Sequence, residues 1–330
     1  MNSFIRLSAE RRRLLCEEGF QRLGLVPASI EKDFWVCWTL RELFGLPEWG
    51  PHLTFKGGTS LSKGWQLISR FSEDIDVVID REFLGFGGEL SRNKRKQLIA
   101  ECSRRIRATL LPDLERRCRE VLSTDLKWEL VPDAEDPDDQ TLLFRYPSVF
   151  EGSIAYIRPV VKIEMGARSE PEPVESPSIQ PYLAKAFPDV MPDSLCSIQT
   201  VVARRTFWEK AMLLHEANFL PPDKKLPPRL SRHYYDLWCL IGHGIAREAM
   251  GDLDLFDRAA RHREIFFKRT GVDYGTLRKG TLQVSPREER LGGWRKDYEA
   301  MRSEMFFEEP PSFAEVLMAI RGFEDDFNRS

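Results

Sequence analysis

Residues 56–80 read KGGTSLSKGWQLISRFSEDIDVVID, and this stretch decides the fold that the sequence predicts. A short apolar run ends at Phe55 and meets the glycine pair Gly57-Gly58, which indicates a strand, a glycine turn and the start of a helix. The β-branched run at its far end predicts a second strand over residues 75–79. The stretch therefore predicts two strands connected through a glycine turn and a helix.

Two carboxylates lie at the second of these strands. Because side chains two residues apart on a strand point to the same face, Asp74 and Asp76 are expected to lie side by side. Their mutual repulsion favours a divalent cation, and oxygen ligands favour Mg²⁺ or Mn²⁺. Gly57 and Gly58 let the backbone approach a ligand closely, and a helix starting near Thr59 directs N–H groups at an anion.

Each half of this pattern also has an ordinary explanation. A pair of aspartates on a strand is commonly a solvated edge, and two glycines before a helix are common turn chemistry. Their occurrence in this order, on neighbouring elements, favours a site where phosphates meet metal-binding carboxylates. Transfer of a nucleotidyl group from a triphosphate requires such a site.

Length and composition limit the remaining possibilities. The chain has 330 residues, with 42% hydrophobic and 31% charged residues, which predicts two domains and a large core. Its 49 Lys and Arg against 52 Asp and Glu exclude a wholly basic nucleic-acid binder. The six cysteines form no C-x-x-C pair, so neither a disulfide framework nor a zinc site is expected. Without a long apolar run or a signal peptide, the sequence predicts a cytoplasmic protein that does not bind membranes.

The pattern changes from mixed to helical along the chain. We expect an α/β domain over residues 1–195 and a helical domain over residues 196–330, joined through a proline-rich connector at residues 169–182. Strands of the first domain, besides those above, are predicted at residues 126–131, 141–146 and 155–165, the first two as an antiparallel hairpin. The main helices are predicted at residues 27–44, 91–120, 199–219, 231–241, 252–268 and 312–327.

With these motifs in order, the chain resembles the nucleotidyltransferase superfamily, and most closely the AbiEii/AbiGii toxin branch, whose members include MenT-like enzymes of toxin–antitoxin systems. The resemblance extends from residues 56–80 to Val161–Arg168, Arg205–Lys210 and His233–Leu237. It implies an α+β fold, a nucleotidyltransferase-like mixed sheet flanked by helices, with a C-terminal helical domain. The 15 residues between Gly58 and Asp74 exceed the usual spacing, which predicts either a longer helix or a protruding loop near Ser69-Arg70.

The resemblance also implies roles for individual residues. The catalytic residues would be Asp74, Asp76, Lys210 and Asp236, the last two contributed by the helical domain. The metal ligands, for Mg²⁺ or alternatively Mn²⁺, would be Asp74, Asp76 and Glu164. The nucleotide-binding residues would be Gly57, Gly58, Thr59, Ser60, Lys63, Arg70 and Lys162.

Several of these residues have alternative explanations. Lys63 and Arg70 could equally be solvated helix charges, and Glu164 could be a solvent-facing residue of an edge strand. A lysine at the border of an apolar helix face, such as Lys210, often places only its ammonium in water. A structural pair of Asp236 with Lys210 is the alternative to a catalytic role for both.

The acceptor of the nucleotide is less constrained. The predicted helix over residues 91–119 carries 10 Lys or Arg against 3 Asp or Glu, which favours a nucleic acid, although charge runs are often only solvated faces. A second basic cluster, with two phenylalanines among its cations, lies at residues 258–269. MenT-like relatives act on tRNA 3′ ends, so the resemblance implies an NTP substrate, a tRNA acceptor and a cognate AbiEi-type antitoxin. The alternatives are transfer to a protein or small molecule, and a non-catalytic nucleotide- or RNA-binding module.

Overall fold

The strand that precedes the glycine turn lies inside a mixed seven-stranded sheet. β1 (Leu53–Lys56) pairs antiparallel with β2 (Ile75–Ile79), and β2 pairs in parallel with β5 (Val160–Gly166). The strand order across the sheet is β3-β4-β5-β2-β1-β9-β6. The central pairings put Lys56 opposite Asp76 and Asp76 opposite Glu164. Residues far apart in the sequence therefore meet at one register position.

A computed structural model describes residues 1–150, 158–221 and 224–329. They form two compact units, the first comprising Met1–Gly64 and Ser72–Thr200 and the second comprising Trp65–Phe71 and the chain from Val201. The change at Thr200 lies close to the boundary that we predicted at residue 195. The short segment Trp65–Phe71, which we placed in the first domain, belongs instead to the second unit.

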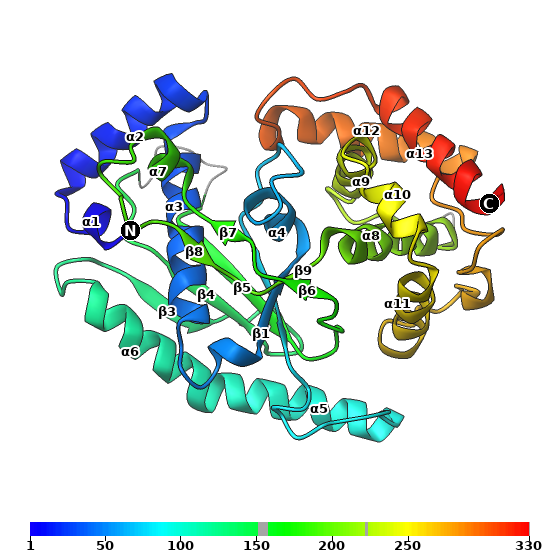
Figure 1. Ribbon diagram of the computed structural model, residues 1–330, viewed down its shortest axis with the longest axis horizontal. Coiled ribbons are helices and arrows are strands. Elements are labelled where there is room, and N and C mark those ends of the chain that lie inside the picture. The colour runs from blue at the N-terminus through cyan, green and yellow to red at the C-terminus, as the bar shows by residue number, and fades with distance from the viewer. Residues whose placement is uncertain (151–157, 222–223, 330) are drawn as a thin grey trace. The chain divides into compact units, whose positions relative to one another are not determined.

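The first unit combines the sheet with flanking helices (Figure 1). Its helices, including two short helices of other types, are α1 (Asn2–Ile5), α2 (Ala9–Leu23), α3 (Pro27–Phe44), η1 (Gly50–His52), α4 (Gly57–Lys63), α5 (Arg92–Arg105), η2 (Ile106–Leu110), α6 (Leu111–Val121) and α7 (Tyr182–Ala186). Its remaining strands are β3 (Glu129–Pro132), β4 (Thr141–Arg145), β6 (Val174–Glu175), β7 (Ser178–Ile179), β8 (Cys196–Ser197) and β9 (Thr200–Val201). A mixed sheet flanked by helices confirms the predicted fold class.

The predicted strands of the first unit agree well with the observed ones. β2 has the predicted bounds, and β3 and β4 form the predicted antiparallel hairpin, with Leu130 opposite Phe144. The predicted strand 155–165 is observed from Val160 onward, and its residues 155–157 lie outside the described part. The long basic helix is divided by a π-helical turn, η2, into α5 and α6. The connector holds the short strands β6 and β7.

Helix α3 is buried on nearly all sides and carries charged side chains inside the unit. It begins with Pro27 in its first turn, as the fixed φ of proline favours. Lys32, which is 3% exposed, forms an ion pair with Glu73 at 2.5 Å, and Asp33 forms one with Lys63 at 2.5 Å. Buried charges are tolerated when they are paired, so α3 fixes both the end of α4 and the residue before Asp74.

The second unit is helical in its described residues. Its helices are α8 (Ala203–Asn218), α9 (Arg232–Gly242), α10 (Ile245–Met250), α11 (Leu253–Phe266), η3 (Tyr274–Thr276), α12 (Glu288–Met305) and α13 (Phe313–Arg329). Trp208 of α8, fully buried, packs edge-on against Phe256 of α11 and tilted against Phe327 of α13. We predicted four of these helices and missed α10 and α12. None of the described helices of either unit is long and apolar enough to cross a membrane.

Candidate functional site

The glycine turn touches the strand that carries the aspartates. Gly57 begins α4 with φ +81°, in the left-handed region that glycine adopts without steric cost. A Cβ atom built on Gly57 would lie 2.0 Å from Asp76 Oδ2 and 2.7 Å from its Cγ. The absence of a side chain at this position therefore makes room for the Asp76 carboxylate.

The hydroxyl groups that follow the turn hold it against β2. Thr59 Oγ1 donates to the carbonyl oxygen of Asp74 at 2.5 Å and lies 2.8 Å from Ser72 Oγ. Ser60 Oγ donates to the carbonyl of Gly57 at 2.8 Å. Both residues are buried. Their predicted role in binding nucleotide remains a prediction, and their contacts show that they fix the turn relative to Asp74.

Three carboxylates lie at the adjoining strands β2 and β5. Asp74 immediately precedes β2, Asp76 lies on it, and both are half-buried. Glu164 of β5 is the register partner of Asp76. Burial raises the pKa of Asp74, and the negative charges of Glu73 and Glu164 raise it further. Lys162 offsets part of this repulsion, because its ammonium lies 2.7 Å from Glu164 Oε1.

The fit of a divalent cation can be judged from these side chains. No group of three or more His, Cys, Asp or Glu side chains among the described residues is close enough to hold a metal ion. Asp74 and Asp76 nevertheless have the hard oxygen atoms that Mg²⁺ prefers. Burial and the negative charges of Glu73 and Glu164 raise the pKa of Asp74, which a bound cation would oppose. The chemistry of these oxygen atoms therefore fits a divalent cation, and Glu164 forms an ion pair with Lys162.

Lys63, for which we predicted a contact with the triphosphate, forms a buried ion pair. Its side chain is 3% exposed, its ammonium pairs with Asp33, and it lies 3.5 Å from the ring centroid of Tyr182. Burial alone would lower the pKa of Lys63, but Asp33 raises it above its ordinary value, so the residue stays charged. The buried ion pair joins α4 to α3, and the role of Lys63 toward the triphosphate stays a prediction.

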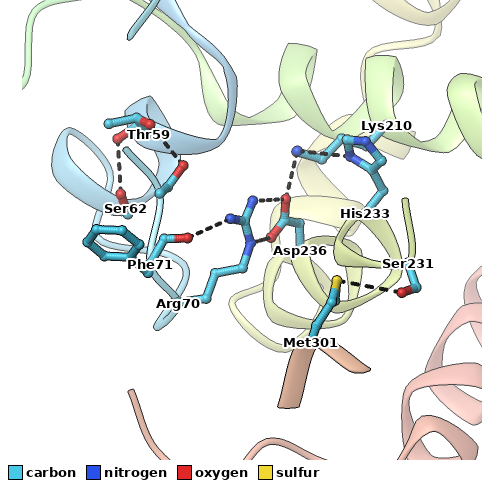
Figure 2. Close-up of polar contacts among 10 residues, drawn as sticks. Thr59, Ser62, Arg70, Phe71, Lys210, Ser231, His233, Asp236 and Met301 are labelled. Atoms are coloured by element: carbon cyan, nitrogen blue, oxygen red, sulfur yellow. Dashed lines mark hydrogen bonds and ion pairs between the residues drawn. The ribbon is translucent and has the colours of Figure 1, made fainter. Parts of the chain in front are cut away.

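Lys210 and Asp236 form an ion pair inside the second unit. Lys210 Nζ lies 2.7 Å from Asp236 Oδ2, and Arg70 grips the same carboxylate through Nε and Nη2, at 2.6 and 2.8 Å (Figure 2). His233 Nδ1 lies 3.4 Å from the Lys210 ammonium. The side chain of Asp236 is 0% exposed and that of Lys210 is 7% exposed. The four side chains form one buried polar group, which we call the Asp236 cluster.

Charge and burial compete in this cluster. Burial alone would raise the pKa of Asp236, but Arg70 and Lys210 lower it below its ordinary value. Burial lowers the pKa of Lys210, Asp236 opposes this, and Arg70 adds to the lowering. Burial, followed by the charge of Lys210, keeps the pKa of His233 well below its ordinary value, so the imidazole is neutral. The cluster thus holds two cations and one carboxylate.

The Arg70 side chain is buried and bound within the second unit, and its predicted role stays a prediction. We predicted that it contacts the triphosphate, but its side chain is 3% exposed and its third donating nitrogen, Nη1, binds the carbonyl of Phe71 at 3.0 Å. These contacts leave the guanidinium committed to Asp236. His233, which we did not predict, lies three residues before Asp236 on α9, and this helical spacing was the signal that could have identified it.

The two basic segments are more neutral than their sequences suggest. In α5, η2 and α6, six of the ten arginines and lysines counted above form ion pairs with carboxylates, namely Arg104, Arg105, Arg107, Arg116, Arg117 and Arg119. Exposed cations remain at the start of α5, at Arg92, Lys94 and Lys96. In the second segment, Arg263 and Arg269 contact the buried Glu216. The start of α5 is thus an accessible basic surface, and Arg258 and Arg261 of the second segment are exposed as well.

Comparison with known proteins identifies the family. Residues 38–319 match the family model described as nucleotidyl transferase AbiEii toxin, type IV toxin–antitoxin system. No sequence among the curated proteins matches the chain.

Three of the solved structures that match the chain come from two bacteria. MenT4, a nucleotidyltransferase toxin from Mycobacterium tuberculosis, is 18% identical with a TM-score of 0.51, and the match covers 95% of this chain and 88% of MenT4. A putative nucleotidyltransferase from Helicobacter pylori is 15% identical with a TM-score of 0.42, covering 91% of this chain and 95% of that protein. JHP933, also from Helicobacter pylori, is 14% identical with a TM-score of 0.38, covering 88% and 89%. The MenT4 match supports the assignment of the fold.

Proposed function

The chain belongs to the AbiEii family of nucleotidyltransferase toxins of type IV toxin–antitoxin systems, and we propose that it transfers a nucleoside monophosphate from an NTP to the 3′ end of a tRNA. The observation that carries the proposal is the register of the central strands. Asp76 faces Glu164 across β2 and β5, Asp74 lies two residues away, and the Gly57 backbone leaves space for Asp76. Membership of the family indicates the class of reaction, and the carboxylates have the oxygen atoms that could hold the divalent cation of such a reaction.

The reaction can be written with these side chains. A terminal hydroxyl of the acceptor attacks the α-phosphorus, a new P–O bond forms, and the bond to the β-phosphate breaks to release pyrophosphate. The hydroxyl proton passes to water or to a carboxylate of the pair. Asp74 and Asp76 would hold Mg²⁺ or Mn²⁺, which supplies positive charge beside the phosphates and carboxylates.

Lys210 is the cation that we propose for the triphosphate. We assign its ammonium to the charge that develops on the leaving pyrophosphate, with Asp236 holding it in place at 2.7 Å. The alternative, a purely structural pair, predicts that Lys210→Arg changes stability and not turnover. Lys162, whose side chain is 38% exposed and forms an ion pair with Glu164, remains a proposed contact for nucleotide.

The acceptor and partners are also proposals. The resemblance to MenT-like enzymes favours tRNA, and the exposed cations at the start of α5 suit a phosphate backbone. A type IV system implies an antitoxin partner, for which we propose an AbiEi-type protein, and a cytoplasmic location agrees with such a system.

The test is transfer of label from each of four α-labelled NTPs, with Mg²⁺, to total RNA. We expect label on RNA of tRNA size with the unaltered protein and none with an Asp74→Asn/Asp76→Asn double variant. Asp189→Asn, at an exposed position of the first unit, is the control and should transfer normally. Label on protein or on a small molecule instead of RNA would select a different acceptor. NTP binding without transfer to any acceptor would contradict the enzymatic proposal.

A further inference from the structure

The loop that carries Arg70 is fixed within the second unit by its backbone. Phe71 N donates to the carbonyl of Met305 at 2.6 Å, and Phe307 N donates to the carbonyl of Ser69 at 3.4 Å. Arg70 and Phe306 form an antiparallel bridge between these bonds. The position of the loop therefore does not depend on the Arg70 side chain alone, which makes substitutions of that side chain informative.

The guanidinium fixes the plane of the Asp236 carboxylate. Two parallel N–H···O bonds from one planar fork define both the position and the rotation of a carboxylate, which a single lysine bond does not. Nη2 of Arg70 and Nζ of Lys210 share one oxygen, Asp236 Oδ2, at 2.8 and 2.7 Å. Arg70 therefore sets the orientation of the Asp236 carboxylate that accepts the hydrogen bond from Lys210.

The charges of the cluster matter as well as its geometry. Arg70 and Lys210 are two buried cations that share the single carboxylate of Asp236, and the half-buried His233 is neutral. Because Arg70 is a cation close to the Lys210 ammonium, its repulsion offsets part of the electrostatic attraction between Asp236 and Lys210. A polyphosphate would bring the negative charge that this group lacks.

We propose that Arg70 is a positioning residue for nucleotidyl transfer, which orients Asp236 toward Lys210 and keeps the ammonium available to the leaving phosphates. This inference rests on the proposed function of Lys210. The long spacing between Gly58 and Asp74 contains the loop that places Arg70 in the Asp236 cluster. A merely structural arginine would anchor the loop, and its replacement would lower stability without lowering kcat.

Two substitutions separate these roles. Arg70→Lys keeps the charge and loses the fork, and Arg70→Gln loses both. We expect kcat for transfer to RNA to fall about tenfold or more in both variants, with a smaller change in KM for NTP, because orientation errors of about 1 Å reduce turnover strongly. The groups that face Lys210 are Asp236, His233 and Arg232 of α9 and Arg70 itself. Loss of the Arg70 charge should move the alkaline limb of the kcat profile to higher pH in Arg70→Gln only.

A matched control exists in the same unit. Arg263 donates hydrogen bonds from Nε and Nη2 to the carboxylate of the buried Glu216, at 2.6 and 2.8 Å. Arg70 binds Asp236 with the same geometry. Arg263→Gln should lower thermal stability comparably and leave kcat and the alkaline limb in place. If Arg70→Gln behaves like Arg263→Gln, or if Arg70→Lys retains normal kcat, the inference is overturned.

A readout without turnover distinguishes this failure from failure of the proposed function. NMR titration of the Lys210 side chain in the unaltered protein and in Arg70→Gln should give a higher pKa in the variant. Equal values would contradict the influence of Arg70 on Lys210 even if the protein proved inactive on RNA. A higher value with no transfer by the unaltered protein would uphold that influence and refute only the reaction.

Discussion

Substitution of Gly57 by alanine tests whether the glycine turn serves the Asp76 carboxylate. The new Cβ would lie 2.0 Å from Asp76 Oδ2 and 3.0 Å from its Cβ, so the carboxylate has to move by about 1 Å or more to reach an ordinary contact. The left-handed backbone, with φ +81°, adds roughly 1–2 kcal/mol of strain for a residue with a Cβ. The variant therefore combines a backbone cost with a displaced catalytic group.

Gly85→Ala separates these two effects. Gly85 has φ +86°, and a Cβ at this position meets nothing within 4 Å. Both variants should lose a similar roughly 1–2 kcal/mol in urea unfolding from the backbone alone. Displacement of the carboxylate should lower transfer from α-labelled NTP about 100-fold in Gly57→Ala, because misplacement by about 1 Å has effects of this size. Gly85→Ala should transfer normally.

The comparison can refute the reasoning in two ways. Equal transfer rates in the two alanine variants would show that Asp76 accommodates the methyl group or takes no part in the reaction. A loss of activity in Gly85→Ala as large as in Gly57→Ala would show that backbone strain, and not the contact with Asp76, determines the rate.

Two further substitutions test features of the structure away from the chemistry. Lys63→Ala should lower the free energy of unfolding by about 3–5 kcal/mol in urea titration, because it leaves Asp33 charged and buried without its partner; a large rise in KM for NTP with unchanged stability would instead support direct phosphate binding. Burial lowers the pKa of His215 to about 4. Below pH 6.5 the unfolded chain therefore binds a proton at this residue that the folded chain does not bind. Up to about 3 kcal/mol of the free energy of unfolding should be lost between pH 6.5 and 4. In His215→Gln the dependence of unfolding free energy on pH should be weaker, since Thr276 and Gln283 then contact a side chain that does not titrate. An unchanged pH dependence would rule out His215 as its source.

Much of the fold could be predicted from local pattern. The β-branched run at residues 75–79 and the polar loop between residues 132 and 140 identified β2 and the hairpin of β3 and β4 because each pattern is local. The π-helical turn inside the basic helix and the short strands of the connector depend on packing, which no window of sequence contains. Helix α12 carries a weak apolar pattern and was missed for the same reason.

The candidate site was predictable where it follows from strand geometry. Asp76 lies on β2, Asp74 immediately precedes that strand, and Glu164 is opposite Asp76, because the motifs mark positions at neighbouring strands. The ion pairs of Lys63 and Arg70 were not predicted, because a sequence shows that a cation is present but not which distant carboxylate it contacts. Asp33 is 30 residues from Lys63, and Asp236 is 166 residues from Arg70. Such pairings are decided by the tertiary structure.

The most direct test of the central claim compares α- and γ-labelled NTP in one transfer assay with tRNA and Mg²⁺. The claim is that Asp74 and Asp76 promote transfer of the α-phosphoryl nucleoside. The α-label should appear on tRNA, the γ-label should appear only in pyrophosphate, and Asp76→Asn, shown to be folded by its melting curve, should abolish both products. Transfer of γ-label to the acceptor, or undiminished transfer of α-label by Asp76→Asn, would contradict the account.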